Sequence, residues 1–210
     1  LQAHEDGRVV FFCGAGISRP AGLPGFKGLV DSIYKDVNTV MENNERAAYV
    51  KGQFDATLNL LEHRLPGQRL KVRKALEKGL QPKWRRRDAT KTHSALLQLA
   101  RCKEGKLRLV TTNFDRIFER AAKRTKQSIS TFTAPTLPIP KNSRWDGLVY
   151  LHGQLPNKDD PSALNRLVLT SGDFGLAYLI ERWAARFVSE LFRNYVVCFI
   201  GYSIDDPVMR

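Results

Sequence analysis

The chain has 210 residues, of which 42% are hydrophobic, and its formal net charge at pH 7 is +13. This length and this apolar fraction are typical of a globular domain with a sizeable core, and they exclude an intrinsically disordered chain. No uninterrupted apolar run approaches the length of a transmembrane helix, and the first residues do not have the pattern of a secretion signal.

Apolar runs alternate with helical patterns along the chain, which indicates a parallel sheet covered by helices. Strands are expected at residues 9–12, 107–110, 128–133, 148–151 and 196–200, with a short extended segment at 167–169. The strands at 9–12, 107–110 and 196–200 are expected to be buried. Helices are expected at residues 28–40, 54–65, 69–80, 92–101 and 117–123, and a long amphipathic helix at 173–193. The predicted fold class is therefore α/β, a Rossmann-like parallel sheet with helices on both faces.

The segment from about residue 31 to residue 92 has no strand pattern. We interpret it as a helical insertion between the first and second strands, packed over the sheet edge. The chain opens on Leu1 and ends three residues after Pro207, where a further helix is expected. We therefore expect residues 1–210 to be one domain of a longer protein.

A glycine-rich turn directly follows the first predicted strand. It contains Gly14, Ala15 and Gly16, and Ser18 leads from it towards a helical segment. In such a turn, backbone N–H groups can approach a phosphate closely, and the positive end of a helix favours the anion. The turn alone is a weak indication of a nucleotide site.

Polar residues follow three further strands at their carboxyl ends. The sequences are Thr-Thr-Asn-Phe-Asp at residues 111–115, His-Gly at 152–153 and Gly-Tyr-Ser at 201–203. Because ligands of open parallel sheets bind beyond the carboxyl ends of the strands, we expect these side chains to meet the glycine turn at one rim.

The order of these motifs resembles that of the sirtuin superfamily of NAD-dependent enzymes. The sequences that carry the resemblance are GAGIS with GLPGF, then TTNFD, LHG and GYS. The match spans residues 9–203 and implies that the ligand is NAD, which the protein consumes as a substrate.

The resemblance implies a role for each matching residue. His152 stands at the position of the general base, and an imidazole can accept a proton near neutral pH. Asn113 matches the residue that orients the ribose and the attacking water, and Asp115 matches a carboxylate of the nicotinamide pocket. Contacts to the phosphates and riboses are implied for Gly14, Ala15, Gly16, Ser18, Phe26, Gly201 and Ser203.

Departures from the family pattern favour one branch of it. The two cysteine pairs of the zinc module are missing, so no metal site is expected. The family sequence PDFR reads PGFK at residues 24–27, and Thr112 replaces a glutamine. The chain thus resembles the zinc-less, sirtuin-like NADase domains of bacterial antiphage defence proteins, which implies cleavage of NAD to nicotinamide and ADP-ribose with water as acceptor.

Two other functions stay open at this point. One is NAD-dependent deacylation of protein lysines, and the other is sensing of NAD or ADP-ribose without catalysis. The motif residues also have structural interpretations: Asn113 and Ser203 can cap helices, Asp115 can interact with a helix dipole, and Phe26 can belong to the core. We interpret His93, which begins a helix, as structural.

The remaining composition bears on compartment and partners. Cys13, Cys102 and Cys198 are widely spaced and form no Cys-x-x-Cys pair, which suits a reduced, cytoplasmic protein. The basic segment at residues 83–87 is either a solvated face or, as the less favoured interpretation, a nucleic-acid contact. We expect a homo-oligomer or associated sensor modules, and no membrane partner.

Overall fold

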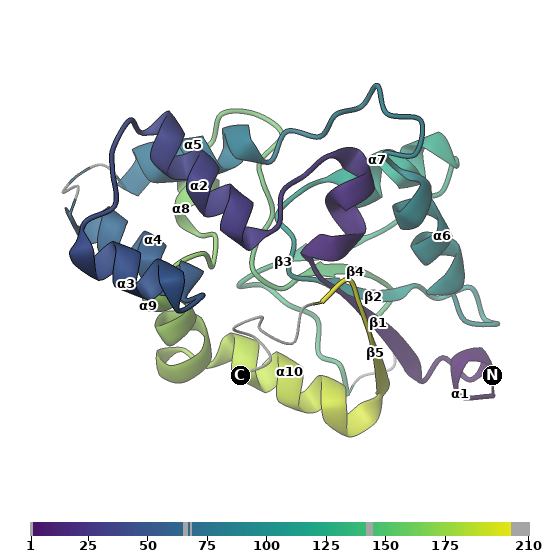
Figure 1. Ribbon diagram of the computed structural model, residues 1–210. Coiled ribbons are helices and arrows are strands. Elements are labelled where there is room, and N and C mark those ends of the chain that lie inside the picture. Colours follow the sequence, from purple (N-terminus) through teal and green to yellow (C-terminus); the bar gives the residue numbers. More distant parts are fainter. Residues whose placement is uncertain (1, 65–66, 68, 142–144, 203–210) are drawn as a thin grey trace.

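The computed structural model describes residues 2–64, 67, 69–141 and 145–202, and it is built on a five-stranded sheet (Figure 1). All strands are parallel, in the order β3-β4-β2-β1-β5. The strands are β1 (Val9–Cys13), β2 (Arg108–Thr111), β3 (Thr131–Thr133), β4 (Gly147–Tyr150) and β5 (Val196–Ile200). The predicted fold class is confirmed.

Helices cover both faces of the sheet, as the apolar runs in the strands require. Phe11 and Leu109 point to the face covered by α6 (Lys91–Leu99) and α7 (Ile117–Arg124). Phe12 and Val110 point to the opposite face, where α10 (Trp183–Asn194) packs. In Figure 1, α10 runs along the bottom and α6 and α7 lie at the upper right, with the strands between them.

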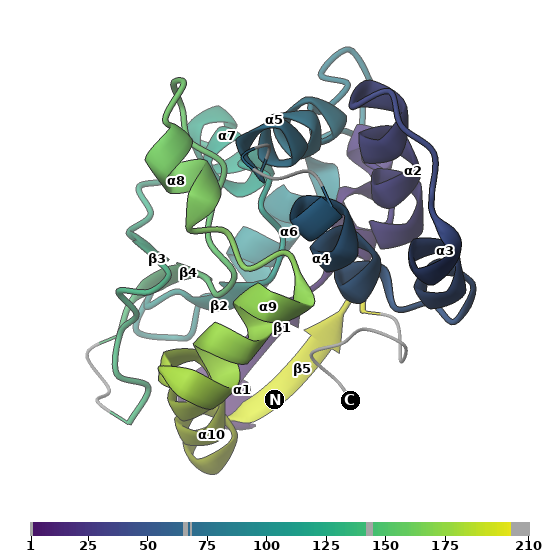
Figure 2. The same cartoon turned by 90° about the vertical axis from the view of Figure 1, so that its left-hand side faces the viewer.

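Several helices lie between β1 and β2, as the sequence predicts. They begin with the 3-10 helix η1 (Ala15–Ala21), followed by α2 (Phe26–Asp36), α3 (Asn43–Val50), α4 (Phe54–Arg64), α5 (Arg69–Gly79) and α6. Ile33, Leu58 and Leu76 belong to a core that α2, α4 and α5 share. Figure 2 shows α2 to α5 grouped on one side of the molecule, beyond the tip of β5.

Two of the predicted strands differ from the sequence analysis, β5 in its burial and β3 in its length. The run at residues 196–200 was expected to be buried, but β5 is an edge strand in which Val196 is 58% exposed. An apolar run does not reveal whether its strand has one neighbour or two. Strand β3 is shorter than the predicted 128–133. The segment at 167–169, expected to be short and extended, is not part of the sheet, and Leu167 and Leu169 are buried.

The long helix expected at residues 173–193 is broken into three parts. Helix α9 (Ser171–Phe174) continues into the π-helix η2 (Gly175–Ile180), and α10 begins only after Arg182, whose φ is +61°. A non-glycine residue with positive φ ends the regular helix and changes the chain direction. Continuous apolar spacing does not reveal such a break. The short helices α1 (Gln2–Glu5) and α8 (Pro161–Asn165) were also not predicted.

A buried ion cluster joins the helical insertion to α9. Arg73 is 0% exposed and pairs with Glu62 at 2.7 Å and with Asp173 at 2.5 Å. Its guanidinium also donates to the carbonyl oxygen of Leu167 at 2.6 Å, and Arg69 pairs with both carboxylates. The cluster therefore fixes α5 against the segment that carries Phe174.

Across the described ranges, no helix combines the length and apolar character needed to cross a membrane.

Candidate functional site

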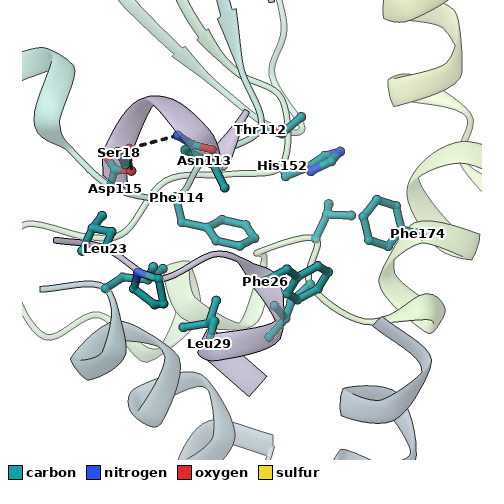
Figure 3. Close-up of a pocket in the computed structure, with 15 residues that line it drawn as sticks. Ser18, Leu23, Phe26, Leu29, Thr112, Asn113, Phe114, Asp115, His152 and Phe174 are labelled. Atoms are coloured by element: carbon teal, nitrogen blue, oxygen red, sulfur yellow. Dashed lines mark hydrogen bonds between the residues drawn. The ribbon is translucent and has the colours of Figure 1, made fainter. Parts of the chain in front are cut away.

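A pocket opens where the carboxyl ends of β1, β2 and β4 face the helical insertion (Figure 3). Its empty volume is about 680 Å³, a figure that includes open solvent at the mouth. Its lining is mostly apolar with a few convergent polar groups, as is typical of small-molecule sites. The lining residues are Ala15, Ser18, Leu23, Pro24, Phe26, Leu29, Leu80, Thr112, Asn113, Phe114, Asp115, His152, Val168, Leu169 and Phe174.

The structure brings six of the predicted site residues together around this pocket. They are Ala15, Ser18, Phe26, Asn113, Asp115 and His152. In Figure 3, Ser18, Asn113 and Asp115 form one group, while His152 and Phe174 lie across the pocket and Phe26 projects from the helical side. Three separate strand ends thus supply a hydroxyl, an amide, a carboxyl and an imidazole to one space.

A hydrogen-bond network links the turn after β1 to the loop after β2. Ser18 Oγ donates to Asp115 Oδ2 at 2.8 Å, and Asn113 Nδ2 donates to Ser18 Oγ at 3.1 Å. Asn113 Nδ2 also lies 3.1 Å from the carbonyl oxygen of Gly14. The residue at the N-cap of α7 is Arg116, so Asn113 does not cap that helix.

Asp115 is nearly inaccessible to solvent, and its burial raises the pKa of the carboxyl from 3.8 to about 6. The hydrogen bond from Ser18 and one from the backbone N–H of Ile117 oppose this rise, because both favour the charged form. The contact with Ile117 also means that Asp115 supports the start of α7. The side chain therefore combines a structural contact with a position at the pocket wall.

His152 follows β4 and is 4% exposed. The next residue, Gly153, has φ of +92°, and a Cβ there would lie 2.9 Å from a methyl group of Leu167. His152 Nε2 lies 3.0 Å from the hydroxyl of Tyr178, and the ring of Phe174 packs edge-on at 5.0 Å. Burial lowers the pKa of the imidazole from 6.5 to about 3, so the ring is neutral at pH 7.

Gly14, Gly16 and Gly201, which the sequence predicts to contact NAD, form a close contact between the ends of β1 and β5 and do not line the pocket. The N–H of Gly14 donates to Ile200 O at 2.9 Å, and the N–H of Gly16 donates to Gly201 O at 2.8 Å. A Cβ on Gly16 would lie 2.8 Å from the Cα and the carbonyl oxygen of Gly201. In this structure both N–H groups serve the contact between β1 and β5, and their phosphate contacts stay a prediction. Ser203 lies outside the described residues.

Sequence reasoning missed several side chains around the site. Phe174 and Tyr178 lie in the segment predicted as one long amphipathic helix at 173–193, and no motif marked either residue as part of the site. Thr112 Oγ1 lies 2.6 Å from the hydroxyl of Tyr202, a contact that no motif signalled. His93 Nε2 lies 3.4 Å from Ser18 Oγ, and burial lowers the pKa of His93 to about 3.

Two further kinds of ligand are a metal ion and a nucleic acid. Within the described ranges, no three His, Cys, Asp or Glu side chains gather closely enough to hold a metal ion. In the basic segment at residues 83–87, the guanidinium of Arg120 stacks 4.5 Å from the ring of Trp84, and Lys83 packs beside Gly22. A nucleic-acid contact there remains the less favoured prediction.

Comparison with known proteins points to the same family as the motifs. Residues 107–210, which include Asn113, Asp115 and His152, match the family model of the SIR2-like domain. The chain is also 34% identical over 212 residues to the uncharacterized protein y4cA of Sinorhizobium fredii (strain NBRC 101917 / NGR234). That match covers 98% of this chain but 17% of the relative's length. Residues 107–210 therefore carry a SIR2-like domain, in agreement with the sirtuin resemblance of the motifs.

Proposed function

We propose that this domain hydrolyses NAD, releasing nicotinamide and ADP-ribose. The observation that carries the proposal is the convergence of Ser18, Asn113, Asp115 and His152 on one largely apolar pocket. A SIR2-like domain implies the use of NAD. The pocket supplies the polar groups that cleavage of the nicotinamide–ribose bond requires.

The chemistry of this bond decides what the side chains must do. Nicotinamide is already cationic in NAD, so it leaves as a neutral molecule without a proton from an acid. The site has to hold the ribose, stabilise the positive charge that develops on it and direct water to it. Asp115 can stabilise that charge or bind the carboxamide, and Asn113 can orient the ribose and the water. His152, neutral at pH 7, can accept the proton that water or a ribose hydroxyl releases.

Aromatic rings support a role in excluding bulk water. Phe26 lines the pocket from α2 and Phe174 lines it from α9. The ring of Phe26 packs against that of Phe54 at a centroid distance of 5.8 Å. Apolar walls keep the local dielectric low, which strengthens the interaction between a carboxylate and a developing cation. The proposal therefore assigns these rings to shielding of the reacting ribose.

Two features of the sequence make lysine deacylation the weaker alternative. The segment between His152 and Gly201, where the family resemblance places the zinc module, contains Cys198 as its one cysteine. The sequence PGFK at residues 24–27 lacks the acidic residue and the arginine of the deacylase pattern. A non-catalytic sensor is also less favoured, because binding alone does not require both Asn113 and His152.

The biological setting is part of the same proposal. Unrestrained hydrolysis would deplete NAD, so the domain has to be controlled by other parts of its protein or by oligomerisation. The relative y4cA is far longer than this chain, which leaves room for such modules in a protein of that kind. We propose an effector role in a bacterial antiphage defence protein, with residues 1–210 as its catalytic domain.

The test is an assay of NAD cleavage by the full-length protein, with and without an acylated lysine peptide. Hydrolysis predicts that nicotinamide is released without peptide, and that His152→Ala and Asn113→Ala abolish the release. Release that depends on the peptide would establish a deacylase. Binding of NAD without turnover, in every oligomeric form of the protein, would establish a sensor.

A further inference from the structure

Tyr178 is the polar side chain that the structure places against the imidazole of His152. It belongs to the π-helix η2, and its hydroxyl lies 3.0 Å from His152 Nε2. Phe174 packs against both rings, at 5.0 Å from His152 and 5.9 Å from Tyr178. The break at Arg182 allows η2 to lie over His152 while α10 covers the sheet. π-helical turns are rare and frequently occur at functional sites.

The two nitrogens of His152 therefore have different surroundings. Nε2 is engaged by Tyr178, whereas Nδ1 has no hydrogen-bond partner among the described residues. His152 lines the pocket and Tyr178 does not. In a neutral imidazole one nitrogen carries the proton and the other has the basic lone pair, and the hydrogen bond at one nitrogen sets the state of the other.

We propose that Tyr178 is a positioning residue for NAD hydrolysis: its hydroxyl accepts the Nε2–H of His152 and leaves the Nδ1 lone pair for the substrate. This inference rests on the function proposed above. It assigns the base to Nδ1 and gives the π-helix a task that the family motifs do not include.

The path of the proton in the proposed reaction follows from this arrangement. Water forms a bond to the ribose carbon as the bond to nicotinamide breaks, and the electrons of the broken bond neutralise the nicotinamide ring. The proton that water loses goes to Nδ1. The resulting imidazolium still donates Nε2–H to Tyr178, so the ring keeps its orientation while it carries the charge. The same contact thus serves both protonation states.

Because the buried ring of His152 is neutral, the position of its single proton decides which nitrogen can act as a base. Burial lowers the pKa of His152 to about 3, so the neutral form and its choice of tautomer prevail at pH 7. Without a partner at Nε2, both tautomers become accessible and the ring can turn within its apolar surroundings. A fraction of the molecules would then present a protonated nitrogen to the substrate.

The test compares Tyr178→Phe with the parent in the full-length protein. Phenylalanine keeps the ring that contacts Phe174 and removes only the hydroxyl. We expect kcat for NAD cleavage to fall by about 10-fold to 100-fold, as for other groups that orient a functional imidazole, while KM changes little. Tyr195→Phe is the matched control, because its hydroxyl also makes a 3.0 Å hydrogen bond, to Pro140 O, away from the pocket.

A second measurement reads the tautomer directly. Spectra of ¹⁵N-labelled histidine, with His152 assigned by its loss in His152→Ala, should show Nε2 protonated in the parent and a tautomer mixture in Tyr178→Phe. Protonated Nδ1 in the parent, unchanged kcat in Tyr178→Phe, or an equal loss in Tyr195→Phe would overturn the inference. If the parent cleaves no NAD, the proposed function fails, whereas the tautomer measurement still tests the contact with Tyr178.

Discussion

Ser18 and Asp115 are joined by a hydrogen bond of 2.8 Å that links the turn after β1 to the loop after β2. The bond lies at the pocket wall, and Asn113 donates to the same hydroxyl. The carboxyl of Asp115 is thus held in place at the cost of losing contact with water. Because the buried carboxyl is poorly hydrated when it is charged, the stability of the fold depends on pH.

Replacing Asp115 by asparagine should change how stability depends on pH. The folded state raises the pKa of Asp115 from 3.8 to about 6, so it binds the proton more tightly than the unfolded chain does. The free energy of unfolding of the parent therefore falls as pH rises from about 4 to about 6. Above about pH 6 the loss of stability caused by the ionised, buried Asp115 stays constant. The full difference corresponds to about 3 kcal/mol.

Chemical denaturation of the parent and of Asp115→Asn at pH 4 and pH 7.5 measures this effect. Asparagine has no charge to desolvate, so the parent should lose stability relative to the variant between the two pH values. His93 and His152 titrate in both proteins, and their contributions cancel in the comparison. A stability difference that is the same at both pH values would show that burial does not raise the pKa of Asp115.

Adding a methyl group at Gly16 should separate the ends of β1 and β5. The new Cβ would lie 2.8 Å from backbone atoms of Gly201, which cannot move aside as a flexible side chain can. We expect Gly16→Ala to destabilise the fold by about 1–3 kcal/mol and to reduce NAD cleavage. Gly175→Ala is the control, since nothing lies within 4 Å of the Cβ built there. Equal melting temperatures for the two variants would contradict the close contact.

Removing the guanidinium of Arg73 should loosen the helical insertion. Arg73→Ala leaves Glu62 and Asp173 with a lost partner in a buried setting, and we expect a loss of about 3 kcal/mol in the free energy of unfolding. Because Asp173 precedes Phe174, NAD cleavage should fall as well. Lys74→Ala removes an exposed ion pair with Asp159 from the same helix and should change stability by less than about 0.5 kcal/mol. Comparable losses of stability in the two variants would show that the buried cluster does not stabilise the helical insertion.

The strand ends could be predicted from sequence because their signals are local. Apolar runs followed by Gly14–Gly16, Asn113 and His152 indicate both the strands and the edge of the sheet at which a ligand binds. The helical insertion was predictable for the same reason, since its segment lacks any strand pattern. These features depend on a few neighbouring residues and on the general rules of parallel sheets.

The contacts that shape the pocket could not be predicted, because they join residues far apart in the chain. Arg73 meets Asp173 across 100 residues, and the basic residues of α5 give no sign of which arginine is buried. The apolar stripe at 173–193 does not show that the chain turns at Arg182. The position of Tyr178 against His152 depends on that turn and so was missed with it.

The most direct test of the proposed function is the stoichiometry of NAD cleavage by the full-length protein in the absence of any peptide. We predict one nicotinamide and one ADP-ribose for each NAD consumed, and loss of both products in His152→Ala while the variant keeps the melting temperature of the parent. NAD that stays intact under conditions in which it demonstrably binds, or cleavage that persists in His152→Ala, would contradict the account.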